Sequence, residues 1–434
     1  MKTPLLLSLL LAFFVACTSD STTANPATPE GGEPGNPSNP GSSENPGNTD
    51  NPGSNSGKAM KGALYFPSTM NVAAVDQMYS NWIGRYYVTF SEEVNPADLD
   101  YYNEFKLPWL KISARIKYDT PEQTVSEGVG YGMLLAAFQG DKTRFDAIMN
   151  YYLAWRVSPE SGSYFMNWKI NGFRAIKGGG SATDADIDIV AALLVAYEKW
   201  GEAQYLQYAK ENAGSIYRDE VNSSTHLFTP GNAFTKSDVY NISYFSLAAL
   251  HMLVEYDKDH DWNTVLEASI TYMKKVQDAG NGLWPDWSDA SGVPTDAGNG
   301  ATTSRNGANK YFGLEGIRIP FRLVWDYYWF GDERVKSMIS KAAAYTYAQV
   351  GGDVKKAKSS YIYQGTDTEV HGLGGRGFEA AFCALAMVDA QYADYLATCN
   401  NVVLNRALPN SGTDYFEPSI QMLYAMLLNG KVAR

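Results

Sequence analysis

Apolar residues recur with helical spacing along most of the chain, and this periodicity limits the possible folds more than any other feature. The segments with this spacing include 71–87, 127–139, 184–199, 242–256, 262–277, 319–329 and 378–387. Such spacing gathers apolar side chains on one face of an α-helix. Long alternating patterns typical of β-strands are lacking, and no strict heptads run on as they would in a coiled coil. We therefore expect an all-α fold.

Long loops rich in Gly, Asn, Asp and Tyr separate these helical segments. The clearest are 168–183, 222–241 and 278–314. Loops of this length inside a compact domain are usually functional. Helix pairs joined by long loops at one end indicate an α/α barrel, with a substrate cleft lined by loops and helix starts.

The N-terminal residues have the features of an export signal. Lys2 supplies a charge, 5–15 is a short apolar run, and Ala16 precedes Cys17. The run is too short to span a bilayer comfortably. Its end resembles a bacterial lipobox, which implies lipidation of Cys17 and a membrane-anchored protein; a plain cleaved signal is the alternative. Asp20 resembles a surface-sorting signal, so we expect the outer membrane or the cell surface of a Gram-negative bacterium.

Residues 18–57 consist almost only of Asn, Pro, Gly, Ser, Thr and Glu. Such a segment cannot bury enough apolar surface to offset its ordering entropy, so we expect a disordered linker. The predicted organisation is a signal peptide over 1–17, this linker over 18–57, and one catalytic domain over 58–434.

The charge and the few cysteine and histidine residues exclude several classes of partner. A formal net charge of −12 argues against nucleic acid, because phosphate binding needs a basic face. The four histidines are scattered and no Cys/His cluster has metal spacing, so we expect no metal and no cofactor. Cys383 and Cys399 could pair in an exported chain, but Cys383 lies in an apolar helical run, which favours a buried free thiol.

The segment 124–135 is the first candidate for chemistry. Ser126 is placed to cap a helix, so Glu127 falls in the first turn. Closely spaced glycines follow, each costing about 1 kcal/mol of helix propensity relative to alanine, which indicates that something approaches closely. The alternative is that Glu127 only complements the helix dipole.

A second acidic segment covers 181–194. Thr183 or Asp184 can cap the helix, and acids alternate at Asp184, Asp186 and Asp188. The order of an EF-hand calcium loop is not met, because glycine and glutamate are missing from its sixth and twelfth positions. We expect Asp186 and Asp188 to act as helix caps.

These segments resemble glycoside hydrolase family 8, the group of endoglucanases, lichenases, chitosanases and some xylanases. The resemblance extends from about 62 to 430 and includes Ser126-Glu127-Gly128, the signature over 182–186, and Asn241 with 243–245. Val190 and Ile242 depart from the usual alanine and proline. The resemblance implies an (α/α)6 barrel in which Glu127 is the proton donor and Asp184 binds and distorts the sugar at the cleavage point.

The expected base departs from the family pattern. The segment 311–322 resembles the family's Tyr-Asp-Ala-x-Arg-x-Pro-Trp-Arg, and Glu315 stands where the family has its basic aspartate. Inverting cleavage needs an acid and a base roughly 6.5–9.5 Å apart, with a water between the base and the sugar. We predict Glu315 as the base. The alternatives are a loop aspartate, namely Asp286, Asp289 or Asp296, or an ion pair of Glu315 with Arg318 or Arg322.

By the same resemblance, further residues are expected to line the cleft. Trp168, Tyr244 and Trp284 are candidate stacking platforms, and Arg318 is expected beside the base. His371, in a glycine-rich loop, is either a sugar contact or a surface residue.

Together these observations predict a monomeric, inverting endo-β-1,4-glycanase that acts on a polysaccharide. The segment around Glu127 looks more like the cellulase and lichenase branch, so β-glucan is the first substrate and chitosan, xylan or oligoxylan the alternative. A carbohydrate-binding lipoprotein that has lost catalysis is a hypothesis of another class, and a helical-barrel lyase is a third.

Overall fold

The computed structural model describes residues 58–156, 163–235, 238–295, 311–362, 375–409 and 414–434. All of them belong to one compact unit. The predictions for Cys17, Asp20 and the linker lie outside the described residues, as do those for Asp296 and His371.

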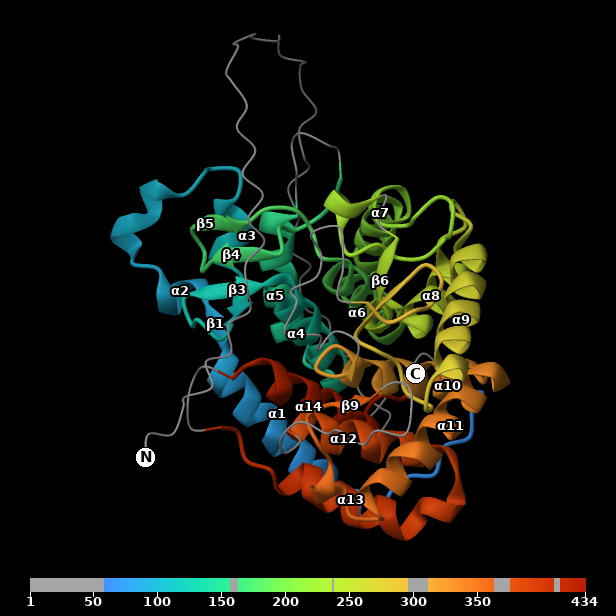
Figure 1. Ribbon diagram of the computed structural model, residues 1–434. Helices are drawn as coiled ribbons and strands as arrows, with labels where there is room; N and C mark the ends of the chain where they lie inside the picture. Colours follow the sequence, from blue (N-terminus) through green and yellow to red (C-terminus); the bar gives the residue numbers. More distant parts are fainter. Residues whose placement is uncertain (1–57, 157–162, 236–237, 296–310, 363–374, 410–413) are drawn as a thin grey trace, which may run out of the picture. The chain divides into compact units, whose positions relative to one another are not determined.

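Helices dominate the described part of the chain (Figure 1). The longer ones are α1 Val72–Tyr86, α4 Ser126–Gln139, α5 Lys142–Trp155, α6 Thr183–Trp200, α7 Ala203–Asp219, α8 Leu247–Tyr256, α9 Trp262–Ala279, α10 Ile319–Phe330, α11 Glu333–Val350, α12 Arg376–Leu385, α13 Ala393–Asn405 and α14 Phe416–Leu428. Two short helices, α2 Phe90–Glu93 and α3 Leu107–Lys111, precede α4.

Six of these helices close into an inner ring. In order around the ring α4, α6, α8, α10, α12 and α14 each contact the next, and α14 returns to α4. An outer helix packs against each member: α5 on α4, α7 on α6, α9 on α8, α11 on α10, α13 on α12, and α1 on α14. Alternation of inner and outer helices defines an (α/α)6 barrel, which confirms the predicted fold class.

Burial distinguishes the inner helices from the outer ones. In α4 every residue from Gly128 to Phe138 is buried, whereas α7 buries only one face, which includes Tyr205, Ala209 and Ile216. A helix that is apolar all round must lie in a core, and an amphipathic helix covers it. Within the described residues, no helix combines the length and apolar character that crossing a bilayer requires.

The strands of the described residues are short and lie in the connections. They are β1 Tyr87–Thr89, β2 Ala114–Ile116, β3 Gln123–Val125, β4 Lys169–Asn171, β5 Ala175–Gly178, β6 Val239–Asn241, β7 Trp287–Asp289, β8 Tyr311–Phe312 and β9 Tyr361–Ile362. All their pairings are antiparallel: β1 with β2, β3 with β4 and β4 with β5, β6 with β7, and β8 with β9. These small sheets fix loops that lead into the inner helices.

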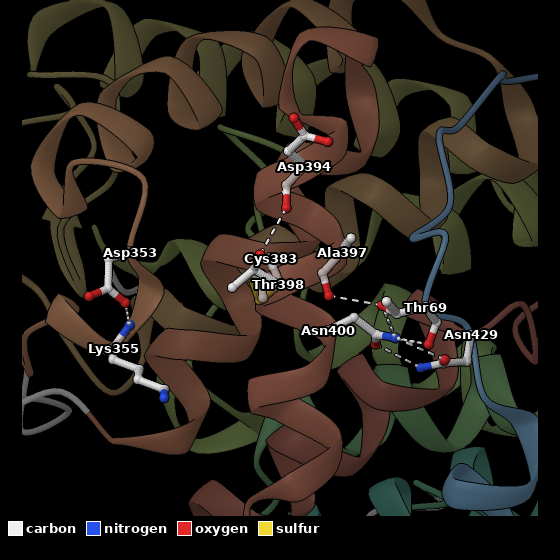
Figure 2. Close-up of a disulfide and its surroundings, with 10 residues drawn as sticks. Thr69, Asp353, Lys355, Cys383, Asp394, Ala397, Thr398, Asn400 and Asn429 are labelled. Carbon is white, nitrogen blue, oxygen red and sulfur yellow. Dashed lines mark hydrogen bonds between the residues drawn. A yellow bond between two sulfur atoms is a disulfide. The ribbon is translucent and has the colours of Figure 1, made fainter.

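The structure corrects the prediction of a free thiol. Cys383 of α12 and Cys399 of α13 form a disulfide, with their Cα atoms 5.7 Å apart (Figure 2). Both side chains are buried, as expected, but the two helices pack so closely that the thiols meet. Beside the disulfide, the side-chain amide of Asn400 donates to the carbonyl of Thr69 at 3.0 Å and that of Asn429 donates to Asn400 at 3.1 Å.

Candidate active site

Charged groups gather where the inner helices begin. Glu127 is the second residue of α4, Asp184 is the second residue of α6, and Arg318 and Tyr415 directly precede α10 and α14. The N-terminal end of a helix carries a partial positive charge from free backbone N–H groups, so carboxylates are favoured there. A ring of such helices therefore forms a site suited to several carboxylates.

Arg318 joins three carboxylates through one guanidinium group. Its Nη1 donates to Asp184 Oδ2 at 2.5 Å and to Glu127 Oε2 at 3.1 Å. Its Nη2 donates to Glu315 Oε2. The Arg318 side chain is only 3% exposed, so these charge-assisted hydrogen bonds form largely away from water. The structure thus brings together the three carboxylates predicted to be catalytic and the predicted arginine.

The surroundings of Glu127 suit a proton donor. Burial raises its pKa to about 7, and the nearby Asp184 and Asp188 carboxylates act in the same direction, whereas Arg318 and a hydrogen bond from Tyr415 oppose them. The Tyr415 hydroxyl donates to Oε1 of Glu127 at 3.1 Å. The Glu127 side chain remains 20% exposed, so substrate can reach it. A carboxyl with this pKa is partly protonated near neutrality, as a general acid must be.

Glu315 is the most accessible of the three carboxylates, with 35% of its side chain exposed. The amide of Asn241 donates to its Oε2 at 2.8 Å. The Asn241 side chain is itself fixed, because its Oδ1 accepts hydrogen bonds from the backbone and the hydroxyl of Ser243. Glu315 is therefore held in place and open to solvent, as a residue that activates water requires.

Asp184 keeps one oxygen available. Its Oδ2 binds Arg318, whereas its buried Oδ1 makes no hydrogen bond with the described residues. A buried carboxylate oxygen without a donor is costly unless a ligand supplies one.

The loop aspartates considered as alternative bases bind backbone amides. Asp286 Oδ1 accepts from the backbone N–H groups of Gly313 and Gly316, both at 2.7 Å, and so anchors the segment that carries Glu315. Asp289 accepts from Ser291 and Val293 in a turn. These contacts fit structural roles.

The cap predictions at α4 and α6 are wrong. The N-caps are Val125 and Ala182, and neither makes a side-chain cap hydrogen bond. Ser126 and Thr183 are instead the first residues of their helices. Each helix follows directly on β3 or on the loop before α6, and therefore begins one residue earlier than the capping pattern suggests.

Asp186 and Asp188 do not cap α6 either. Asp188 forms a buried ion pair with both terminal nitrogens of Arg322, at 2.6 and 3.0 Å. Asp186 faces Glu220 at the end of α7. The ion pair considered as an alternative role for Glu315 does form, with Arg318, whereas Arg322 is bound to Asp188.

Two of the three predicted aromatic platforms lie at the site. The Tyr244 ring lies 5.3 Å from the Arg318 guanidinium. The backbone carbonyl of Trp168 accepts from Ser126 N at 2.9 Å, directly beside Glu127. Both side chains are half-buried and so partly accessible. The prediction for Trp284 is wrong: its ring is 0% exposed and its Nε1–H donates to the Met273 carbonyl, which makes it a core residue.

Sequence reasoning missed Tyr415, and it identified Asn241 only by resemblance. The only sequence signal for Tyr415 was an aromatic residue directly before an apolar helical run. In the described ranges, no group of three or more His, Cys, Asp or Glu side chains is arranged to hold a metal ion.

A helical barrel with carboxylates of unequal exposure facing one guanidinium suits acid–base cleavage of glycosidic bonds. A family model for glycosyl hydrolases family 8 matches residues 75–431. The chain belongs to this family and is a glycoside hydrolase.

Individual relatives agree with this assignment. The chain is 31% identical over 290 residues to Endoglucanase 2 of Ruminiclostridium josui, covering 65% of this chain but only 58% of that protein. It is 30% identical over 350 residues to a beta-glucanase of Niallia circulans, covering 76% of this chain and 83% of the relative. Among solved structures, the apo β-1,3-1,4-glucanase of Paenibacillus sp. X4 superposes with a TM-score of 0.73 at 25% identity, covering 86% and 97% of the two chains.

Proposed function

We propose that the protein is an inverting endo-β-1,4-glycanase that hydrolyses a β-glucan polysaccharide. Glu127 is the general acid, Glu315 is the base, and Asp184 binds the sugar at the cleavage point. The observation that carries this proposal is the connection of all three carboxylates to the Arg318 guanidinium at the starts of the inner helices.

The proposed reaction moves two protons. Glu127 gives its proton to the glycosidic oxygen as the bond from that oxygen to the anomeric carbon breaks. A water on the opposite face attacks the anomeric carbon and gives a proton to Glu315. The new reducing end has the inverted configuration, and exchange with solvent restores Glu127 to the protonated form and Glu315 to the ionised form.

Arg318 supports this division of roles. It forms direct ion pairs with Asp184 and Glu315, whereas its contact with Glu127 is the longer one, at 3.1 Å. The net effect of the surroundings on Glu127 is still a raised pKa, because burial dominates. One cation thus pairs with two carboxylates beside a third carboxyl group whose pKa is raised.

β-Glucan is favoured as substrate because the similar proteins carry the names endoglucanase and beta-glucanase. Chitosan and xylan are the alternatives within the family. A binding protein without catalysis is the alternative from another class, and its support is the Glu315–Arg318 ion pair, which occupies Oε2 of the proposed base.

Reducing-end assays on barley β-glucan, carboxymethyl cellulose, chitosan and xylan test this function. We expect new reducing ends from β-glucan, and a loss of roughly 10²–10⁴-fold in kcat in Glu127→Gln. Glu267→Gln, which changes an exposed carboxylate of α9, is the matched control. Binding without new reducing ends, unchanged in Glu127→Gln, would contradict the enzyme; an unsaturated product absorbing in the ultraviolet would indicate a lyase.

We also propose export and lipid anchoring through Cys17, with the folded domain acting as a monomer on polymer outside the cell. The Cys383–Cys399 disulfide supports export, because disulfides persist in oxidising compartments.

A further inference from the structure

Two more carboxyl groups meet directly behind the site. Asp186 lies two residues after Asp184 in α6, and Glu220 directly follows α7. Both residues are 0% exposed, and their side chains are close enough to share a hydrogen bond. The proposed function assigns neither of them a role.

The donors around this pair do not satisfy two carboxylates. Ser181 donates its hydroxyl proton to Oε1 of Glu220. Both Asp186 carboxyl oxygens and Oε2 of Glu220 are buried without a well-formed hydrogen bond from any described N–H or O–H group. Two ionised carboxylates in contact would repel each other and leave these oxygens unsatisfied, at a high cost in free energy. One proton between them removes the repulsion between two anions and gives two of these three oxygens a hydrogen-bond partner.

We propose that Asp186 and Glu220 share one proton, and that this carboxylic acid–carboxylate pair is a positioning device that holds the first turn of α6, and with it Asp184, against Arg318. The inference rests on the proposed function only where Asp184 is said to bind substrate.

The chain around the pair shows what it joins. Thr183 donates its backbone N–H to the Pro230 carbonyl at 3.3 Å and its hydroxyl proton to the Thr229 carbonyl at 2.7 Å. A Cβ added at Gly231 would lie 2.3 Å from the Ser181 carbonyl oxygen, so the chain after α7 crosses directly over the start of α6. The pair thus links the end of α7 to the start of α6 beneath a closed backbone layer.

The charges facing the pair favour retention of the proton. Burial raises the pKa of Asp186 and of Glu220, and the Asp184 carboxylate on α6 raises both further. Tyr152 on α5 also senses the charge of Asp186. Hydrogen bonds with Ser181 and Asp186 lower the pKa of Glu220, and a contact with the Ala182 backbone lowers that of Asp186, but burial has the largest effect on both.

Thermal unfolding as a function of pH tests the shared proton without any catalytic assay. A carboxyl whose pKa is higher in the folded than in the unfolded chain binds an extra proton on folding, so stability falls as pH rises above the unfolded value. Measurements in a Glu127→Gln background exclude the contribution of that residue. In Glu220→Gln and in Asp186→Asn an amide N–H replaces the shared proton and does not titrate.

We expect the Tm of the background protein to fall between about pH 6 and about pH 9 by about 3 °C more than that of either amide variant. At about pH 6 the Tm of both amide variants should be close to that of the background protein, because the amide N–H preserves the hydrogen bond between the two side chains. Equal falls in all three proteins, or amide variants already unfolded at the lower pH, would overturn the shared proton.

Activity in the otherwise wild-type protein tests the positioning role. We expect Glu220→Gln to keep kcat within about threefold, and Glu220→Ala to lose about tenfold or more, because Asp184 moves relative to the sugar. Equal losses in both variants would contradict positioning by the pair. If Glu127→Gln were as active as wild type, the proposed function would be wrong. The unfolding experiment would still show whether Asp186 and Glu220 share a proton.

Discussion

The Arg318 guanidinium binds three carboxylates and so fixes their positions relative to one another. Lysine keeps its charge but lacks the planar fork that reaches different acceptors. We expect Arg318→Lys to lower kcat roughly a hundredfold. Arg322→Lys, which changes the neighbouring ion pair to Asp188, should mainly lower stability. Comparable kcat losses in the two variants would argue against a special role for Arg318.

The raised pKa of Glu127 predicts a pH dependence. Because burial places this pKa at about 7, kcat/KM should fall above that pH as the acid loses its proton. The Tyr415 hydrogen bond lowers the pKa, so Tyr415→Phe should move this alkaline limb up by about one pH unit. A limb that stays in place or moves down in Tyr415→Phe would assign it to another group.

At the residue scale, the structure brings together residues that were predicted from short local motifs. Glu127 and Asp184 lie in short segments whose helix starts could be identified, and Arg318 was expected beside the base from the family resemblance. Tyr415 could not be found in this way, because it meets Glu127 across 288 residues of sequence. Trp284 was misplaced because the same aromatic composition suits a core and a sugar platform.

The glycines of α4 show how one element meets its neighbours. Sequence analysis predicted a close approach, and the structure identifies the partners as parts of the chain itself. A Cβ at Gly130 would lie 3.1 Å from that of Asp188 on α6, and one at Gly132 would lie 2.8 Å from the Ile116 side chain. The helix-propensity cost is therefore offset by tight packing of the inner ring.

Alanine substitution tests this packing. We expect Gly130→Ala to destabilise the protein by about 1–3 kcal/mol, because the new methyl group forces α4 and α6 apart. Gly84→Ala in α1 is the matched control, since nothing lies within 4 Å of its Cβ position; it should stabilise by about 0.5–1 kcal/mol. Denaturant unfolding measures both. A neutral Gly130→Ala would show that the ring tolerates a wider spacing.

The disulfide between α12 and α13 is a second element-scale feature. Its cysteines are separated by 16 residues, a loop whose closure stabilises by about 3 kcal/mol in the chain-entropy account. We expect Cys399→Ser to lose about this much stability in denaturant unfolding, and reduced wild type to behave like the variant. Two reactive thiols in unreduced, denatured Cys17→Ser protein would contradict the bond.

At the element scale, the sequence predicted the inner helices better than the outer ones. Five inner helices correspond to segments with clear apolar spacing, whereas α5, α7, α11 and α13 were not singled out. Closure of the ring could not be predicted from periodicity, because it depends on contacts between α14 and α4, far apart in the chain. The cap positions were wrong because tertiary packing, not local capping, sets where α4 and α6 begin.

At the scale of the whole molecule, the proposed lipid anchor determines where the protein is located and does not affect its catalytic activity. We expect Cys17→Ser, expressed in a Gram-negative host, to lose incorporation of labelled palmitate and to leave the membrane fraction. Its specific activity on soluble β-glucan should equal that of wild type, because the candidate active site lies at the N-terminal ends of the inner helices. A variant that stays in the membrane fraction would indicate another mode of attachment.

The central claim is that Glu127 and Glu315 act on opposite faces of the sugar. Real-time proton NMR of the newly formed reducing ends measures this directly, because inversion of a β-linkage releases the α-anomer before mutarotation. We predict that the α-anomer appears first with wild type, that Glu315→Gln almost abolishes the signal, and that Glu315→Asp, which restores the family's residue, keeps inverted product. The β-anomer appearing first, or unchanged turnover in Glu315→Gln, would contradict the account.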